Sequence, residues 1–269
     1  MPSPSLPRKN YKYYDFIMAA FVTVMLCSNL ISAPKRTTLG QVPGLGEVVL
    51  GSGVVFFPIT YIFGDILTEV YGYARSRRVV WAGFAASAFA ALVSFVTVQL
   101  PPDPGWSRHG QTEQAYAEFR ALPPAEQEAQ HAAWQVGKQK IWETVFGGTW
   151  RIVLASLVAF LFGEFANSYV LAKMKIWTNG RWLWTRIVGS TVVGELIDSF
   201  LYLHLAFSGV DGWGERDILR TMSFNYVAKV ANEILMAPAT YWLVAFLKKA
   251  ENEDFYDRDT DFTPFKLGV

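Results

Sequence analysis

The chain has 269 residues, of which 52% are hydrophobic and only 17% are charged, and its formal net charge is +1. Soluble domains contain about 25% charged residues, so the composition argues against an ordinary soluble protein. A near-neutral charge without a dense basic stripe argues against nucleic acid as a partner. The single cysteine, Cys27, cannot form an intrachain disulfide, and no Cys/His cluster has metal-ligand spacing, so we expect no metal or other cofactor.

Apolar blocks long enough to cross a hydrocarbon core about 30 Å thick recur along the chain. In chain order they cover residues 14–33, 54–73, 79–100, 149–171, 184–207 and 224–247. The first block is too long for a signal peptide, and its candidate cleavage site is followed directly by Pro34, so we expect a retained helix. The sequence therefore predicts an all-α integral membrane protein with six transmembrane helices, forming a single domain over residues 1–269.

Basic residues predict the orientation of these spans. Short clusters lie at residues 8–12, 75–78, 173–181 and 248–249, which all fall on one side of the membrane if there are six spans. Both termini are therefore predicted to be cytoplasmic, in a multi-pass protein of the bacterial inner membrane. The polar segment 101–148 is then an extracytoplasmic loop, in which Ala115–Arg120 and Ala125–Val136 are expected to form short surface helices.

Many charged residues lie inside the predicted spans, although a charge at the bilayer centre costs at least about 2.5–3.5 kcal/mol. Asp65 and Glu69 are four residues apart in the second span and so share one helical face. Pro58 precedes them, and we expect it to kink or interrupt that helix. The intramembrane acids are Asp65, Glu69, Glu164, Glu195, Asp198 and Glu233, and the bases are Arg151, Arg186 and Lys229.

Two interpretations of this set are open. The charges pair between helices or snorkel at span ends, or they line a polar cavity. Pairing alone does not require a surplus of acids, and buried pairs barely offset their desolvation, so a cavity is favoured. The sequence contains no P-loop, HExxH or GxSxG motif, and we expect no enzyme activity. Acids, amides and aromatic residues suit a small solute with several N–H donors and a ring that can stack.

The run from Phe57 to Gly72, FPITYIFGDILTEVYG, resembles the signature of the queuosine precursor transporter family, also called the vitamin uptake transporter family. Further matches lie in 151–173, 186–198 and 229–241. The resemblance implies import of 7-cyano-7-deazaguanine, 7-aminomethyl-7-deazaguanine or queuine for tRNA modification. It also implies a fold similar to the substrate-binding subunits of energy-coupling-factor transporters, without a partner ATPase. Segment 101–148 is longer than is typical of the family.

A 7-deazaguanine has adjacent N–H donors for a carboxylate, a carbonyl for a donor and a flat face for an aromatic ring. Candidate acceptors, donors and stacking rings follow from this chemistry. The candidate acceptors are Asp65 or Glu69 together with Asp198 or Glu195. The candidate donors are Asn29, Asn167 or Lys229, and the candidate stacking rings are Tyr61, Phe57 or Phe200. The other intramembrane charges are expected to be structural or coupling residues, namely Arg151, Glu164, Arg186 and Glu233. Asp65 could instead form a structural pair with Arg186 or Lys229.

Two other functions remain open from the sequence. One is a substrate-binding subunit of an ATP-driven vitamin importer, which is disfavoured because Ala19 and Ala20 show no obvious Ala-x-x-x-Ala repeat for docking a coupling protein. The other is a membrane enzyme or assembly factor. The acid surplus also motivates a hypothesis of proton coupling, which uptake indifferent to an imposed pH gradient would contradict. The expected partners are a 7-deazapurine and the lipid bilayer, and a homodimer is left open.

Overall fold

The computed structural model describes residues 10–32, 36–42, 46–51, 57–103, 106, 111–147 and 150–266. The chain divides into two compact units. The first comprises residues 1–88 and 150–269, and the second comprises residues 89–149. The polar cluster and the cavity described below lie within the first unit.

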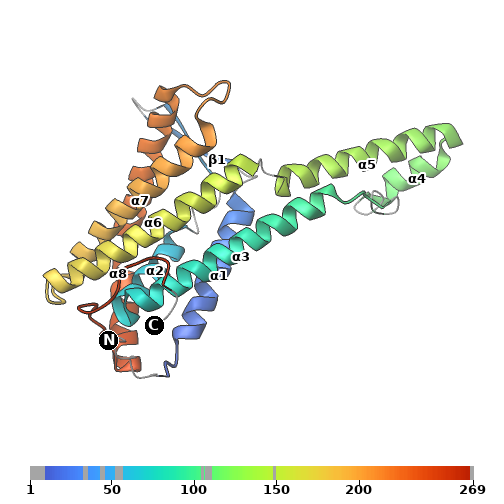
Figure 1. Ribbon diagram of the computed structural model, residues 1–269. Coiled ribbons are helices and arrows are strands. Elements are labelled where there is room, and N and C mark those ends of the chain that lie inside the picture. Colours follow the sequence, from blue (N-terminus) through green and yellow to red (C-terminus); the bar gives the residue numbers. More distant parts are fainter. Residues whose placement is uncertain are drawn as a thin grey trace. The chain divides into compact units, whose positions relative to one another are not determined.

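The first unit is built from long helices (Figure 1). They are α1 (Tyr14–Ser32), α2 (Phe57–Tyr71), the start of α3 (Tyr73–Gln99), α6 (Trp150–Trp177), α7 (Leu183–Phe207) and α8 (Glu215–Glu251). Helix α7 packs against both α6 and α8, and α2 packs against α1, α6 and α8. The helices predicted from the six apolar blocks are thus confirmed as helices, and α8 is considerably longer than its apolar block.

A short antiparallel sheet in the first unit was not predicted. Strand β1 (Arg36–Val42) pairs with β2 (Gly46–Gly51), with Thr38 opposite Val49 and an irregularity between Thr38 and Gly40. The β-branched residues of these strands favour extended backbone, although glycines and prolines also occur in this stretch of the sequence. The chain is therefore predominantly rather than wholly helical.

Three helical stretches among the described residues are long and apolar enough to cross a membrane. They are α3, the stretch Pro124–Trp177, whose last part is α6, and α8. Helix α1 contributes a shorter apolar helix over Tyr14–Ser28. Helix α2 has only 15 residues, and α7 contains the charged residues Arg186, Glu195 and Asp198. The long helices also expose large apolar side chains, such as Phe89 at 68% and Leu235 at 74%. The protein is therefore a membrane protein, and the number of six crossings stays a prediction.

Helix α2 is the most enclosed element of the first unit. Its residues from Thr60 to Tyr71 are buried except Phe63. Pro58 lies in the first turn of the helix, where a missing N–H leaves no helical bond unmade, so it begins α2 rather than kinking it. Gly72 ends the helix with a φ of +87°, a conformation that glycine adopts without strain. Apolar side chains of α2 pack with α1 and α8 to form the core.

The two described ends of the chain lie at the same end of the first unit. The backbone N–H groups of Lys12 and Tyr13 donate hydrogen bonds to the Glu251 carboxylate, at 2.9 and 2.6 Å. Tyr11 donates to Glu253 at 2.8 Å. An even number of membrane crossings requires termini on one side, so this arrangement is compatible with the predicted topology.

Residues 252–266, here called the C-terminal segment, return across the ends of α2 and α3. The backbone N–H of Tyr73 donates to the Asp257 carboxylate at 3.0 and 3.1 Å. Arg77 donates to the carbonyl of Asp261 at 2.9 Å, and Trp81 donates to the carbonyl of Pro264 at 2.8 Å. The structure of this segment was not predicted from the sequence, because an extended segment has no periodic apolar pattern.

The second unit contains the end of α3 together with α4 (Glu113–Ala121) and α5 (Pro124–Phe146). The Thr112 side chain caps α4 by accepting a hydrogen bond from the Ala115 N–H, and α5 begins at Pro124. Gln139 donates to the carbonyl of Val98 at 3.1 Å, which ties α5 to the end of α3. The two predicted surface helices of segment 101–148 are thus confirmed as helices, and the second is longer than expected.

Candidate functional site: a buried polar cluster and a terminal ion network

Two glycines bring α6 and α7 into close contact. A Cβ atom placed at Gly194 would lie 2.8 Å from the Asn167 Cβ and 3.0 Å from the Gly163 carbonyl oxygen. A Cβ atom at Gly163 would lie 2.9 Å from the Asp198 Cβ. Small residues at such a crossing let helix backbones approach closely. The polar residues one turn from these glycines are therefore brought together across the helix pair.

A set of buried and partly buried polar residues surrounds this crossing, and we call it the central polar cluster. It is contributed by α2, α6, α7 and α8. Its members are Asp65, Glu164, Asn167, Glu195, Asp198, Lys229 and Glu233. The exposed fraction of Asp65, Asn167 and Glu195 is 0%, that of Glu164 is 4% and that of Glu233 is 1%. Asp65 lies close enough to Glu164 and Glu233, and Glu164 to Asp198, for their ionised carboxylates to repel one another, and the carboxyl groups of Asp65 and Glu233 are within hydrogen-bonding reach.

Specific contacts hold part of the cluster together. Asn167 donates from Nδ2 to Asp65 Oδ1 at 3.0 Å, joining α6 to α2. Lys229 Nζ on α8 lies 2.6 Å from Asp198 Oδ2 and 2.9 Å from Glu195 Oε2, joining α8 to α7. Lys229 is thus the counter-ion of two carboxylates. Asp65 pairs with an amide rather than with Arg186 or Lys229 in the contacts seen among the described residues.

Several buried polar atoms of the cluster have no hydrogen-bond partner within the described part of the chain. They are Glu164 Oε2, Asn167 Oδ1 and Glu195 Oε1. Asp65 Oδ2 and both carboxylate oxygens of Glu233 also receive no proton while both groups are ionised, although the carboxyl groups of Asp65 and Glu233 are within hydrogen-bonding reach of each other. The hydroxyls of Thr191 and Ser199 on α7 are in the same situation. Proteins satisfy most buried polar groups, and leaving one unsatisfied costs about 1–3 kcal/mol. Such a concentration of unsatisfied buried polar atoms is typical of a site where a ligand binds or protons are taken up.

A small cavity of about 40 Å³ adjoins the cluster. Glu164 and Asp198 contribute its acidic wall, and Tyr61 and Phe160 contribute aromatic rings. The remaining lining residues are Met25, Ser28, Thr60, Ser87, Ser156, Leu157 and Gly163. The volume suits water, since ligand pockets usually measure roughly 300–1,000 Å³. A heterocyclic solute therefore requires the helices or side chains of this wall to separate.

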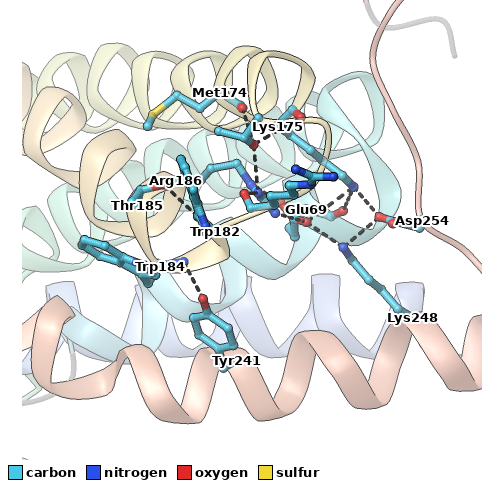
Figure 2. A network of polar contacts seen from close by, with 12 residues as sticks. Glu69, Met174, Lys175, Trp182, Trp184, Thr185, Arg186, Tyr241, Lys248 and Asp254 are labelled. Carbon is cyan, nitrogen blue, oxygen red and sulfur yellow. Dashed lines mark hydrogen bonds and ion pairs between the residues drawn. The ribbon is translucent and has the colours of Figure 1, made fainter.

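Glu69 lies one turn from Asp65 but belongs to a different set of charges, shown in Figure 2, which we call the terminal ion network. Arg186 Nη2 on α7 lies 2.9 Å from Glu69 Oε1, and Lys248 Nζ on α8 lies 2.6 Å from the same oxygen. Lys175 Nζ on α6 lies 3.5 Å from it and donates to the Glu69 carbonyl at 2.6 Å. One carboxylate of α2 thus joins three other helices.

The C-terminal segment completes the terminal ion network through Asp254. Its Oδ1 atom lies 2.6 Å from Lys175 Nζ and 2.8 Å from Lys248 Nζ. Burial raises the pKa of the Asp254 carboxyl, but the hydrogen bonds and the positive charges of Lys175 and Lys248 together hold this pKa below its ordinary value. The ionised form is therefore favoured. The network consists of three cations, Lys175, Arg186 and Lys248, and two carboxylates, Glu69 and Asp254.

The other residues singled out from the sequence lie elsewhere or outside the described parts. Phe200 is 49% exposed, and its ring contacts that of His204 with centroids 4.2 Å apart, so it does not line the cavity. Arg151 donates to the carbonyls of Leu205 and Ser208 at the end of α7. The side chains of Asn29 and Phe57 lie outside the described part of the structure. Tyr61 is the predicted stacking residue that reaches the cavity wall.

Sequence reasoning missed three members of the terminal ion network: Lys175, Lys248 and Asp254. The two lysines stand in basic clusters that were used to set the orientation of the spans, and Lys175 is nevertheless only 1% exposed. Asp254 follows the last apolar block in a polar stretch. Their spacing along the chain gives no signal of contact, because the two lysines reach Glu69 from α6 and α8, and Asp254 reaches the lysines from the C-terminal segment.

Comparisons with known proteins agree with the resemblance stated above. A family model described as "Putative vitamin uptake transporter" matches residues 51–243. The "Probable queuosine precursor transporter" of Bacillus subtilis (strain 168) is 30% identical over 230 residues, which cover 84% of this chain and 81% of the relative. No solved structure matches the chain, so the expected likeness to the energy-coupling-factor subunits stays a prediction. The family predicted from the second-span signature is confirmed: the chain belongs to the vitamin uptake transporter family.

Proposed function

We propose that this protein is a self-contained carrier that imports a queuosine precursor across the bacterial inner membrane, with both termini in the cytoplasm. The candidate substrates are 7-cyano-7-deazaguanine, 7-aminomethyl-7-deazaguanine and queuine. The name of the Bacillus subtilis relative supports this substrate class. The central polar cluster supports a solute site in the middle of the helix bundle, where carriers hold their substrates.

The Asp65–Asn167 pair is the observation on which the proposal depends most. Their mutual hydrogen bond leaves Asp65 Oδ2 and Asn167 Oδ1 as buried acceptors that receive no proton from the described residues while Asp65 and its neighbour Glu233 are both ionised. A deazaguanine presents N1–H and an exocyclic amine side by side, which are two donors for two acceptors. Tyr61 in the cavity wall offers a ring for stacking against the base.

The remaining edge of the base presents a carbonyl, which needs a donor. Lys229 is the basic group of the cluster, and Thr191 and Ser199 supply hydroxyls. Because the cavity is smaller than a deazaguanine, the proposed cycle includes an outward or inward movement of the helices around it. The terminal ion network joins α2, α6, α7 and α8 at one end of the bundle and would have to loosen when that end opens.

Uptake into proteoliposomes tests this function. Vesicles that contain only the purified protein and no ATP are expected to take up labelled 7-cyano- or 7-aminomethyl-7-deazaguanine saturably, with excess unlabelled compound competing and adenine not competing. Vesicles without protein provide the baseline. A protein that binds the compound but transports it only after an ATPase and a coupling protein are added would contradict the self-contained carrier and support the ATP-driven alternative.

A further inference from the structure

We propose that the site selects a substrate with a positive charge on its 7-substituent, and therefore prefers 7-aminomethyl-7-deazaguanine to the neutral 7-cyano compound. This inference rests on the proposed function, because it concerns which member of that substrate class the site favours. It derives from the charges of the central polar cluster and from the carboxylate in the cavity wall.

The charges of the central polar cluster do not balance. The cluster contains five carboxylates, those of Asp65, Glu164, Glu195, Asp198 and Glu233. Among the described residues its cation is Lys229, which forms ion pairs with Glu195 and Asp198. Arg186 and Lys248 of the neighbouring helices are instead engaged with Glu69 and Asp254 in the terminal ion network. Carboxylates in a medium of low dielectric constant repel one another strongly. The excess negative charge of the cluster is therefore neutralised by protons, by a cationic ligand or by both.

Glu164 places a carboxylate in the wall of the cavity. This side chain is 4% exposed, lines the cavity, and has an Oε2 atom without a hydrogen-bond partner in the described structure. Gly64 of α2 leaves room for it, since a Cβ atom there would lie 3.1 Å from Glu164 Oε2. Asp198 forms part of the same wall, but its Oδ2 atom is occupied by Lys229. Glu164 is thus the acceptor available to a cation that enters the cavity.

The cavity wall beside Glu164 also supplies oxygen acceptors. An alkylammonium group has three donors and no acceptor, and it needs one negative charge and further oxygen acceptors. Thr60, Ser87 and Ser156 supply hydroxyl oxygens to the same cavity. A nitrile group, in contrast, has no donor and no charge, and would leave Glu164 without a partner. The Asp65–Asn167 pair would hold the shared deazaguanine edge in both cases.

A matched pair of ligands tests the proposal on the unaltered protein. Binding of 7-aminomethyl-7-deazaguanine is compared with that of 7-hydroxymethyl-7-deazaguanine, which has nearly the same shape and no charge, and with the 7-cyano compound. We expect the amine to bind roughly 10-fold or more tightly than either neutral ligand, as for a charge-assisted hydrogen bond in a buried site. Equal affinities, or a preference for a neutral ligand, would mean that protons alone complete the cluster and would overturn the proposal.

The variant Glu164→Gln, which keeps the shape and removes the charge, assigns the preference to this residue. It is expected to weaken binding of the amine roughly 10-fold, while the affinities for the neutral ligands stay within about threefold of those of the unaltered protein. Equal weakening of all three ligands would overturn the role of Glu164. Asp261→Asn, which alters an exposed carboxylate of the C-terminal segment, is the control. Failure of the unaltered protein to bind any deazaguanine would instead refute the proposed function.

Discussion

Replacing Glu69 with alanine is expected to destabilise the protein by roughly 3–5 kcal/mol, because it leaves buried cations without their counter-charge. Arg186 is 0% exposed and Lys175 is 1% exposed, and both contact Glu69. Asp254 would remain as the only anion of the terminal ion network among its described members. The measurement is the thermal unfolding midpoint of purified protein in mild detergent, together with the yield of monodisperse protein.

Lys248→Met is the informative comparison for Glu69→Ala. Lys248 shares both carboxylates of the network, but removing it leaves two cations facing two anions, and its side chain is 23% exposed. We therefore expect the substitution to lower the stability of the folded protein by only about 1 kcal/mol or less, as for a partly exposed ion pair. If Glu69→Ala unfolded at the wild-type temperature, or Lys248→Met were equally damaging, the three-cation, two-anion description of the network would be wrong.

Gly194→Ala is expected to separate α6 from α7 and to abolish binding of deazaguanines. The new methyl group would lie 2.8 Å from the Asn167 Cβ and 3.0 Å from the Gly163 carbonyl oxygen, and backbone cannot yield there as a flexible side chain would. Overpacking of this kind typically costs about 1–3 kcal/mol. It would also displace Asn167 from its hydrogen bond with Asp65. Ligand binding and thermal unfolding of the variant measure the two effects.

The same substitution at Gly137, in the middle of α5, is the control for Gly194→Ala. A Cβ atom there meets nothing within 4 Å, so only helix propensity changes, in favour of alanine by about 1 kcal/mol. Gly189→Ala is expected to have an intermediate effect on stability and binding. A Cβ atom there would lie 2.9 Å from the Met174 sulfur, which belongs to a flexible side chain that can move aside. A Gly194→Ala protein that binds ligand as tightly as Gly137→Ala would contradict the close crossing of α6 and α7.

The helices could be predicted from the sequence because long apolar blocks require backbone hydrogen bonds to be made within each segment. The ends of the helices were less predictable. Helix α8 continues well beyond its apolar block, since polar residues outside the bilayer also favour helix. The strand pair β1–β2 was missed because its short β-branched runs, such as Thr37-Thr38 and Val48-Val49, are interrupted by glycine and proline.

The candidate site could be predicted only as a set of residues, not as a geometry. Asp65 and Glu69 share a helical face, as their spacing indicates, yet one turn of about 5.4 Å places them in different clusters. Which cation reaches which carboxylate depends on how far α7 and α8 are shifted along α2 and α6, and single-helix periodicity does not contain that information. Contacts made by the C-terminal segment, such as that of Asp254 with Lys175, are equally non-local.

Ligand titration of purified Asp65→Asn beside the unaltered protein tests most directly whether the central polar cluster is a deazaguanine site. Both proteins are titrated with 7-aminomethyl- and 7-cyano-7-deazaguanine, with Asp261→Asn as the surface control. We expect saturable binding to the unaltered protein and to the control, and a loss of roughly 10- to 100-fold in Asp65→Asn, where a charged acceptor of the base is removed. A folded, monodisperse protein that binds neither compound, or an Asp65→Asn variant that binds both normally, would contradict the assignment.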